Sequence, residues 1–329
     1  MRSEFDFINN IKKKFDLRHV GDDCAVLPKD AKTDLLITAD LLVQDVDFRL
    51  DWTTPEYLGH KVLAVSLSDI AAMGGTPLHA MLSIGVPAEL WKTDFLDRFY
   101  EGWHTLAREF DVELVGGDVS RADACVIDSI VMGETARSRA FLRSGARHGD
   151  AIYVSGTLGG SAAGLKLLED GHSEHALIHR HLAPLPRLSL AAALSGLNLV
   201  TSMIDVSDGF AADLAHICRA SDVGATVDAG LLPIDERVVG LFGDQEALDL
   251  ALHGGEDYEL VFTCGPESAS AFEGLQITRV GKINSESGTI GLTRNNQTTT
   301  LPSRGFRHFD RRGFKKKGDD HVDRRPQVL

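Results

Sequence analysis

The first half of the chain, to about residue 150, alternates short apolar runs with longer segments in which apolar residues recur every three or four positions. Short apolar runs are typical of β-strands, and the longer recurrence is typical of α-helices. Strands are predicted at residues 35–38, 80–86, 112–115 and 127–133, and helices at 55–73 and 94–110. This part of the chain is therefore expected to combine helices and strands in one α/β unit.

The helix predicted at residues 55–73 has recognisable boundaries. At its start, either Thr53 and Glu56 form a capping box or Thr54 is the N-cap with a proline next in the chain. Two glycines follow Met73 and are expected to end the helix. Thr93 is the expected N-cap of the second helix.

A polar, glycine-bearing segment at residues 143–150 is the expected joint between two domains. After it the pattern predicts strands at 151–154, 203–206 and 260–263 and helices at 161–168 and 209–219. The hypothesis is an α+β protein with an N-terminal domain at 1–150 and a C-terminal domain at 151–310. The tail at 311–329 is dense in Arg, Lys and Asp and is expected to be disordered.

Composition narrows the classes of function. The 329 residues carry 48 acids against 34 bases, and the resulting net charge of −14 argues against nucleic acid as a main partner. The longest mostly apolar run, residues 188–200, is too short to span a bilayer, so no membrane association is expected. The four cysteines form no C-x-x-C pair, which favours a reducing, cytoplasmic setting without zinc.

Acidic residues gather where predicted elements end. The motifs are Gly21-Asp22-Asp23, Thr38-Ala39-Asp40, Gly116-Gly117-Asp118 and Asp205-Val206-Ser207-Asp208-Gly209. Each one alone is a common turn or helix cap. If they converge, carboxylates without thiolates suit a hard cation such as Mg²⁺. Ser207 and Asp208 also precede a predicted helix, where they are expected as a plain N-cap that is compatible with phosphate binding.

Asp69 is the most unusual of the acids. It follows Leu58, Val62 and Val65 on one narrow stripe of the predicted helix. An ionised carboxylate on an apolar face is costly unless it is paired or metal-bound. Two alternatives stay open: a metal ligand, or a buried Asp bonded to Ser66 or Ser68.

Three further segments bear on function. Residues 254–259 contain two glycines and three acids, which favour a solvated turn or, alternatively, contact with a substrate. The glycine loop at 156–161 matches neither the P-loop nor the dinucleotide-binding pattern, so both of those enzyme classes are rejected. The histidines at 179 and 181 are expected on a surface helix.

Taken in order, the acidic motifs resemble those of the thiamine-monophosphate kinases, a family within the ATP-binding superfamily of aminoimidazole ribonucleotide synthetase. The resemblance runs from about Asp22 to Phe309. Besides the motifs above, it includes Ser68-Asp69-Ile70-Ala71-Ala72-Met73-Gly74, Arg143-Ser144-Gly145-Ala146, Gly254-Gly255-Glu256-Asp257-Tyr258-Glu259-Leu260 and Gly305-Phe306-Arg307-His308-Phe309. The order and spacing make the combination far more specific than any single motif.

The resemblance implies a role for each matching residue. It places several Mg²⁺ ions among Asp23, Thr38, Ala39 (through its backbone), Asp40, Asp69, Asp118, Asp205 and Asp208. It places ATP at Gly117, Asp118, Arg143 and Ser207, with Tyr100 beside the adenosine, and thiamine monophosphate at position 47, Glu256 and Phe306. Asp69, Asp118 and Arg143 would then act in catalysis. The resemblance also implies a two-domain fold, a homodimer formed through the N-terminal sheet, and direct phosphoryl transfer.

Two departures and two alternatives accompany this hypothesis. The family commonly has His where this chain has Asp47, and Asn where it has Ser66. A carboxylate facing a phosphate would repel it unless a metal or a proton intervened. The alternatives are another enzyme of the superfamily with a different acceptor, or a non-catalytic nucleotide-binding protein. The cysteine positions do not fit selenophosphate synthetase or a carbamoyl dehydratase of hydrogenase maturation, which need a reactive Cys near the N-terminus or the C-terminus respectively.

Overall fold

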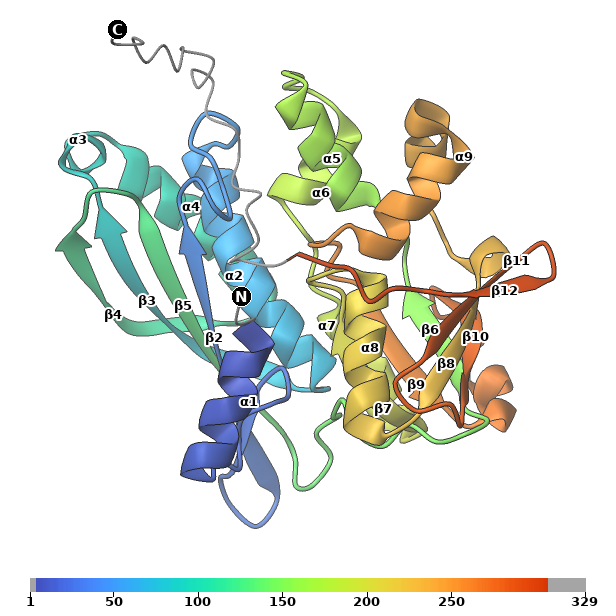
Figure 1. Ribbon diagram of the computed structural model, residues 1–329. Coiled ribbons are helices and arrows are strands. Elements are labelled where there is room, and N and C mark those ends of the chain that lie inside the picture. Colours follow the sequence, from blue (N-terminus) through green and yellow to red (C-terminus); the bar gives the residue numbers. More distant parts are fainter. Residues whose placement is uncertain (1–3, 307–329) are drawn as a thin grey trace, which may run out of the picture.

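The computed structural model describes residues 4–306 as two α/β halves side by side, each built on its own sheet (Figure 1). The first sheet has the strand order β1-β2-β5-β3-β4. Its strands are β1 (Ala25–Pro28), β2 (Thr33–Val43), β3 (Thr76–Val86), β4 (Glu113–Arg121) and β5 (Val126–Ala136). The second sheet has the order β12-β11-β8-β10-β6-β9-β7. Its strands are β6 (Ala151–Ser155), β7 (Val200–Asp205), β8 (Gly224–Asp228), β9 (Leu260–Cys264), β10 (Ile277–Asn284), β11 (Ile290–Arg294) and β12 (Gln297–Thr300).

The helices described in the first half are α1 (Glu4–Phe15), α2 (Pro55–Ala72), α3 (Ala88–Trp91) and α4 (Phe95–Glu109). Of these, α2 and α4 cover one face of its sheet. Figure 1 shows α2 and α4 lying together against the strands. Strands β2, β3 and β5 alternate between buried residues on the helix side and more exposed residues on the other side, which no described element of the chain covers.

The second sheet is packed on both faces. Its helices are α5 (Gly160–Glu169), α6 (Ala176–Leu182), α7 (Leu188–Leu197), α8 (Phe210–Ser221) and α9 (Glu236–His253), with the 3₁₀ helices η1 (Ala229–Leu231) and η2 (Pro266–Phe272). Tyr153 and Phe262 join the core that contains α2 and α7, whereas Val154 and Val261 join the core of α8 and α9. Every residue of β6 and β9 is therefore buried. The described part of the chain contains no helix with the length and apolar character needed to cross a membrane.

The start of α2 matches one of the two predicted forms. Thr54 is the N-cap, and its Oγ1 accepts the N–H of Tyr57 at 3.3 Å. The prediction that Thr93 caps the next helix is wrong, because α4 begins one residue later and its N-cap is Asp94. Thr93 still accepts the N–H of Phe95 at 3.2 Å, so its hydroxyl helps to shape the turn that enters α4.

The strand predicted at 112–115 is too short. β4 continues through the glycine pair to Arg121 and pairs in parallel with β3. Gly117 permits this because a Cβ at that position would lie 1.8 Å from the carbonyl oxygen of Leu82. Asp118 therefore lies within an edge strand and not at a strand end. The tail predicted at 311–329 lies outside the described residues.

Candidate active site

Three carboxylates from distant parts of the chain meet where the two halves touch. Asp23 lies in the loop before β1, Asp69 in the last turns of α2, and Asp205 at the end of β7. One carboxylate oxygen of each lies within 4.8 Å of the others. The fold thus brings together three of the acids that the sequence predicted as metal ligands.

Hydroxyl groups hold these acids in place. Thr38 donates to Asp69, Ser66 donates to Asp40 at 2.7 Å, and Ser68 donates to Asp205 at 2.6 Å. The alternative in which Asp69 bonds to Ser66 or Ser68 is therefore wrong, since each of those serines bonds to another acid. The bond from Ser68 to Asp205 also links α2 of the first half to β7 of the second.

Arg143 supplies positive charge to this cluster. Its guanidinium donates to Asp23 Oδ1 at 2.5 Å, and its backbone N–H donates to Asp22 at 2.8 Å. It is the one basic side chain that residues 4–306 bring within 4 Å of any of these acids. The second oxygen of Asp23 is buried and has no hydrogen-bond partner among the described residues. One cation thus faces several carboxylates, and one buried oxygen is left over.

The pKa values reflect this imbalance. Burial, followed by repulsion from Asp40, Asp205 and Asp23, raises the pKa of Asp69 well above its ordinary value. Burial and then Asp23 raise the pKa of Asp205 to about 7, and burial raises the pKa of Asp40 to about 6. Carboxylates that resist sharing a site unless a cation is added, together with an unused buried oxygen, fit a hard divalent ion such as Mg²⁺.

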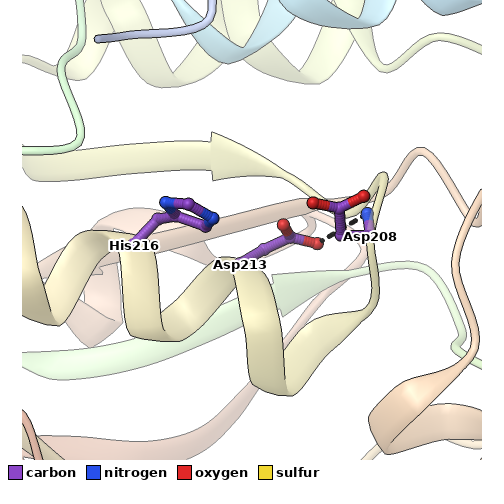
Figure 2. Close-up of side chains that lie close together, drawn as sticks. All are labelled: Asp208, Asp213 and His216. Carbon is purple, nitrogen blue, oxygen red and sulfur yellow. Dashed lines mark hydrogen bonds between the residues drawn. The ribbon is translucent and has the colours of Figure 1, made fainter. Parts of the chain in front are cut away.

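A second acidic group lies nearby, at the start of α8. Asp208, Asp213 and His216 each offer an atom within 4.8 Å of the others, and Figure 2 shows Asp208 in the turn with the other two on the helix. Burial, and then the charges of Arg143 and Arg219, lower the pKa of His216 to about 3, so the ring is neutral. Asp213 and His216 were missed in the sequence, although their spacing of three residues on a predicted helix was the available signal.

Asp213 also explains how α8 begins. The N-cap is Gly209, which makes no side-chain capping bond, so the expectation of a plain cap by Ser207 or Asp208 is wrong. Asp213 Oδ2 instead accepts the backbone N–H of Asp208 at 3.2 Å and of Gly209 at 3.0 Å. The turn that carries Ser207 and Asp208 is thereby fixed from inside the helix.

A cavity of about 720 Å³ is lined by residues from both halves of the molecule. Its lining includes Asp40 from β2 and the turn at Ser207 and Asp208. Glu256 and Phe306, which the resemblance assigns to the thiamine substrate, line the same cavity. Phe306 is 45% exposed, and its N–H donates to the carbonyl of Asp208 at 3.1 Å. One space is therefore lined by part of each expected group: Asp40 and Asp208 for metal, Ser207 for the nucleotide, and Glu256 and Phe306 for the substrate.

Asp47 also lines this cavity, but its carboxylate has a local task. Asp47 Oδ2 accepts the backbone N–H of Val43 at 2.8 Å. That bond closes the turn after β2, where Asp45 has a positive φ of 63°. One oxygen of the unusual acid is thereby directed to the backbone of its own turn.

The segment at 254–259 is not a solvated turn, because Asp257, Tyr258 and Glu259 are buried. Asp257 accepts the N–H of Gly159 at 2.6 Å and of Ser161 at 3.0 Å. The amino end of α5 is therefore already occupied by a carboxylate of the same chain, which agrees with rejecting a phosphate-binding P-loop there.

Three of the residues expected at ATP lie elsewhere within a single chain. Tyr100 is half-buried on α4, and Gly117 and Asp118 lie on β4 at the edge of the first sheet. The pairing register aligns Asp118 with Ser83 and Asp128, and then with Leu41 of β2. Three strand spacings separate Asp118 from β2, about 14 Å. It also lies on the sheet face opposite to Asp40, so one chain alone does not bring it to the carboxylate cluster.

Comparison with known proteins first defines the class. The family model for the N-terminal domain of AIR synthase related proteins matches residues 21–135, and the model for the C-terminal domain matches residues 147–291. The chain is 38% identical to thiamine-monophosphate kinase of Escherichia coli K12 over 304 residues, which cover 88% of this chain and 91% of the relative. It is 35% identical to the enzyme of that name from Bacillus subtilis 168, covering 93% and 99%.

A solved structure gives the same picture. AaThiL complexed with AMPPCP and TMP superimposes with a TM-score of 0.84 at 34% identity, covering 93% of this chain and 97% of that one. The chain belongs to the thiamine-monophosphate kinase family of AIR synthase related proteins.

Proposed function

We propose that this protein transfers the γ-phosphoryl group of ATP to thiamine monophosphate and so forms thiamine diphosphate. One observation carries the proposal at the level of the site: a single cavity is lined by Asp40 of the first half and by Asp208, Glu256 and Phe306 of the second. Family membership supports the choice of reaction, and AaThiL is known in complex with AMPPCP, an ATP analogue, together with TMP.

The proposal assigns the acidic cluster to metal ions. Mg²⁺ would be held by Asp23, Thr38, the backbone of Ala39, Asp40, Asp69, Asp205 and Asp208, with Asp118 added on the dimer described below. Bound there, it would neutralise phosphate oxygens and stabilise the charge of the transition state. The buried Asp23 oxygen, to which no described residue donates a hydrogen bond, and the raised pKa values of the neighbouring acids support this assignment.

The chain's own groups have simple tasks in this reaction. A terminal phosphate oxygen of thiamine monophosphate attacks the γ-phosphorus, and the bond to the β,γ-bridging oxygen breaks, so that ADP leaves. The acceptor oxygen is already ionised at neutral pH, so no residue needs to remove a proton. Arg143, held at 2.5 Å from Asp23, lies close enough to the cluster to pair with a phosphate. Ser207 lies in the turn fixed by Asp213 and would contact ATP.

The test is ADP release by the purified protein with ATP and Mg²⁺. Thiamine monophosphate should stimulate release, and thiamine, which lacks the phosphate acceptor, should not. Stimulation by thiamine alone, or by neither compound, contradicts the proposed acceptor. Omitting Mg²⁺ in the presence of a chelator should abolish the activity.

The uncovered face of the first sheet supports a homodimer. Leu41 is 57% exposed and Met81 is 38% exposed. Half-buried apolar residues lie on the same face: Leu35, Ile37, Ile130 and Met132. An apolar sheet face without a covering layer is typical of an interface, and Asp118 shares this face. A second copy packed here would bring Asp118 into a composite site.

Light scattering on the purified protein tests the dimer. Wild type should have twice the mass of one chain, and Leu41→Asp should shift the protein towards monomer because it buries a charge in the interface. A monomeric wild type would contradict the dimer.

We also infer a reducing, cytoplasmic setting, since Cys24, Cys125, Cys218 and Cys264 are all free, buried thiols.

A further inference from the structure

A lysine lies inside the helix that carries Asp69. Lys61 is 3% exposed in the buried part of α2, between Leu58 and Val62. Its Nζ lies 2.9 Å from Glu256 Oε1 and has no other anionic partner within 4 Å in the part of the chain that the structure describes. Burying an ammonium group costs several kcal/mol, which its partner must offset. An ion pair at the surface would not need a partner to offset this cost, because its charges stay solvated.

Glu256 is held from two sides and from two halves of the molecule. Lys61 of α2 approaches one carboxylate oxygen, and His181 of α6 lies 3.2 Å from the other. The same His181 nitrogen lies 3.1 Å from Ser161 Oγ. The expectation that this histidine lies on the surface is wrong, since it is 5% exposed. Burial, and then Lys61, lower the pKa of His181 to about 3, so the ring is neutral and Lys61 is the cation of the group.

The backbone of Glu256 is restrained as well. It has a positive φ of 62°, and its N–H donates to the carbonyl of Ser207 at 2.8 Å. Burial disfavours the ionised carboxylate, the charge of Lys61 is the largest effect that opposes burial, and the net result is a lowered pKa for Glu256. The result is a fixed negative charge, 28% exposed at its side chain, on the wall of the large cavity.

We propose that Lys61 is a positioning residue for substrate recognition: it holds the Glu256 carboxylate oriented towards the cationic thiazolium ring of thiamine monophosphate. The inference rests on the proposed function, because it takes thiamine monophosphate as the ligand of Glu256. Lys61 is buried behind the carboxylate and does not line the large cavity itself. Its effect should therefore reach the substrate through Glu256 and not through direct contact.

The test compares steady-state constants of Lys61→Met, Glu256→Gln and the double variant. Lys61→Met should raise the KM for thiamine monophosphate about tenfold or more, since removing one member of a buried charge pair leaves the other misdirected. The KM for ATP and kcat should change by no more than about twofold, the scatter expected of uncoupled sites. In the Glu256→Gln background, Lys61→Met should add less than about a further twofold because the shared partner is already gone. Lys166→Met, which removes a lysine from an exposed pair, is the matched control and should leave both KM values unchanged.

Each outcome decides the proposal. Equal increases in both KM values, or a full second increase in the double variant, would show that Lys61 only supports the fold. If Lys61→Met does not fold, Lys61→Gln takes its place, and the selective rise in the KM for thiamine monophosphate must appear in it as in Glu256→Gln; its absence from either variant overturns the inference. The wild-type protein, assayed in parallel, distinguishes failure of this inference from failure of the proposed function. If wild type releases no ADP with thiamine monophosphate, the proposed function itself is refuted.

Discussion

Two groups of buried acids in this molecule differ in how far the chain's own basic and hydroxyl groups balance their negative charge. At the cluster of Asp23, Asp69 and Asp205, Arg143 faces several carboxylates, and Asp23 Oδ2 has no hydrogen-bond partner among residues 4–306. Around Glu259, which is fully buried, the charge is balanced. Arg187 pairs with both of its oxygens, Arg180 lies 3.4 Å away, and Ser155 donates to it at 2.5 Å.

The difference separates architecture from function. A buried acid whose oxygens are all satisfied by the chain needs no further ligand, and the Glu259 network ties α6 and α7 to β6 and β9. Carboxylates that repel each other store unfavourable energy, which a bound cation can release. Substitutions in the two groups should therefore affect activity and stability in opposite proportions.

The largest effect is expected at the unbalanced cluster. Asp69→Asn should lower the rate of ADP release at least about 100-fold, the size of loss expected when one charge contact to the transition state is removed. The metal-free protein should keep its fold and unfold at the same or a higher temperature, because one repelling carboxylate has gone. Activity assays and thermal unfolding in a chelator measure the two effects separately.

Asp118→Asn extends this prediction to the dimer. It should also lower activity by orders of magnitude, although Asp118 lies far from the cluster within one chain. Its unfolding temperature should not change, since Asp118 is exposed in the monomer. Near-normal activity in both Asp69→Asn and Asp118→Asn would refute the metal-binding model.

The two regions also differ in how well the sequence predicted them. Asp23, Asp69 and Asp205 were recognisable because each follows a local pattern: an element end, or an acid on an apolar stripe. The balance around Glu259 was not, since its partner Arg187 is 72 residues away and only the folded chain brings them together. Lys61 and His181 were missed for the same reason.

Secondary structure follows the same rule. The periodic helix α2 was predicted closely, and β3 and β5 were predicted to within four residues at each end, but the prediction at 35–38 covered only part of β2. Helix α7 was noticed only as an apolar run, because its exposed positions also carry apolar residues such as Ala192, Ala193 and Leu197, which hides the helical period. The helix α9 contains Gly243 with a φ of 74°, which interrupts its pattern. The length of β4 depends on the close approach of Gly117 to Leu82, a tertiary contact that local propensity does not encode.

The balanced region should give the largest loss of stability. Arg187→Met should lower the free energy of unfolding by about 3–5 kcal/mol because it leaves Glu259 buried without its main partner. Arg187→Met with Glu259→Gln should recover part of this loss, since no charge is then stranded. Denaturant unfolding measures both variants. A double variant no more stable than the single one would argue that packing, and not charge, is what Arg187 provides.

A smaller effect is expected from pH. The pKa of Asp205 is about 7 in the folded protein against 3.8 as its ordinary value, so the folded state binds more protons between these limits. The free energy of unfolding of metal-free protein should therefore rise as the pH falls from about 8 to about 5. Asp205→Asn should flatten this profile, and saturating Mg²⁺ at pH 8 should raise stability by binding only the folded state. A free energy of unfolding that instead increases with pH over this window would contradict the inference that the metal-free cluster carries excess negative charge.

The smallest effect on stability is expected from removing an exposed ion pair. This substitution tests whether burial, or pairing alone, determines how much stability an ion pair contributes. The side chains of Lys166 and Glu246 are paired but 42% and 41% exposed. Water already solvates both charges, so Glu246→Gln should lower the free energy of unfolding by less than about 1 kcal/mol, and added salt should remove even that difference. Activity should not change, because neither residue lines the large cavity. A loss as large as that of Arg187→Met would mean that pairing alone stabilises this fold, and the contrast between buried balanced and buried unbalanced acids would lose its physical basis.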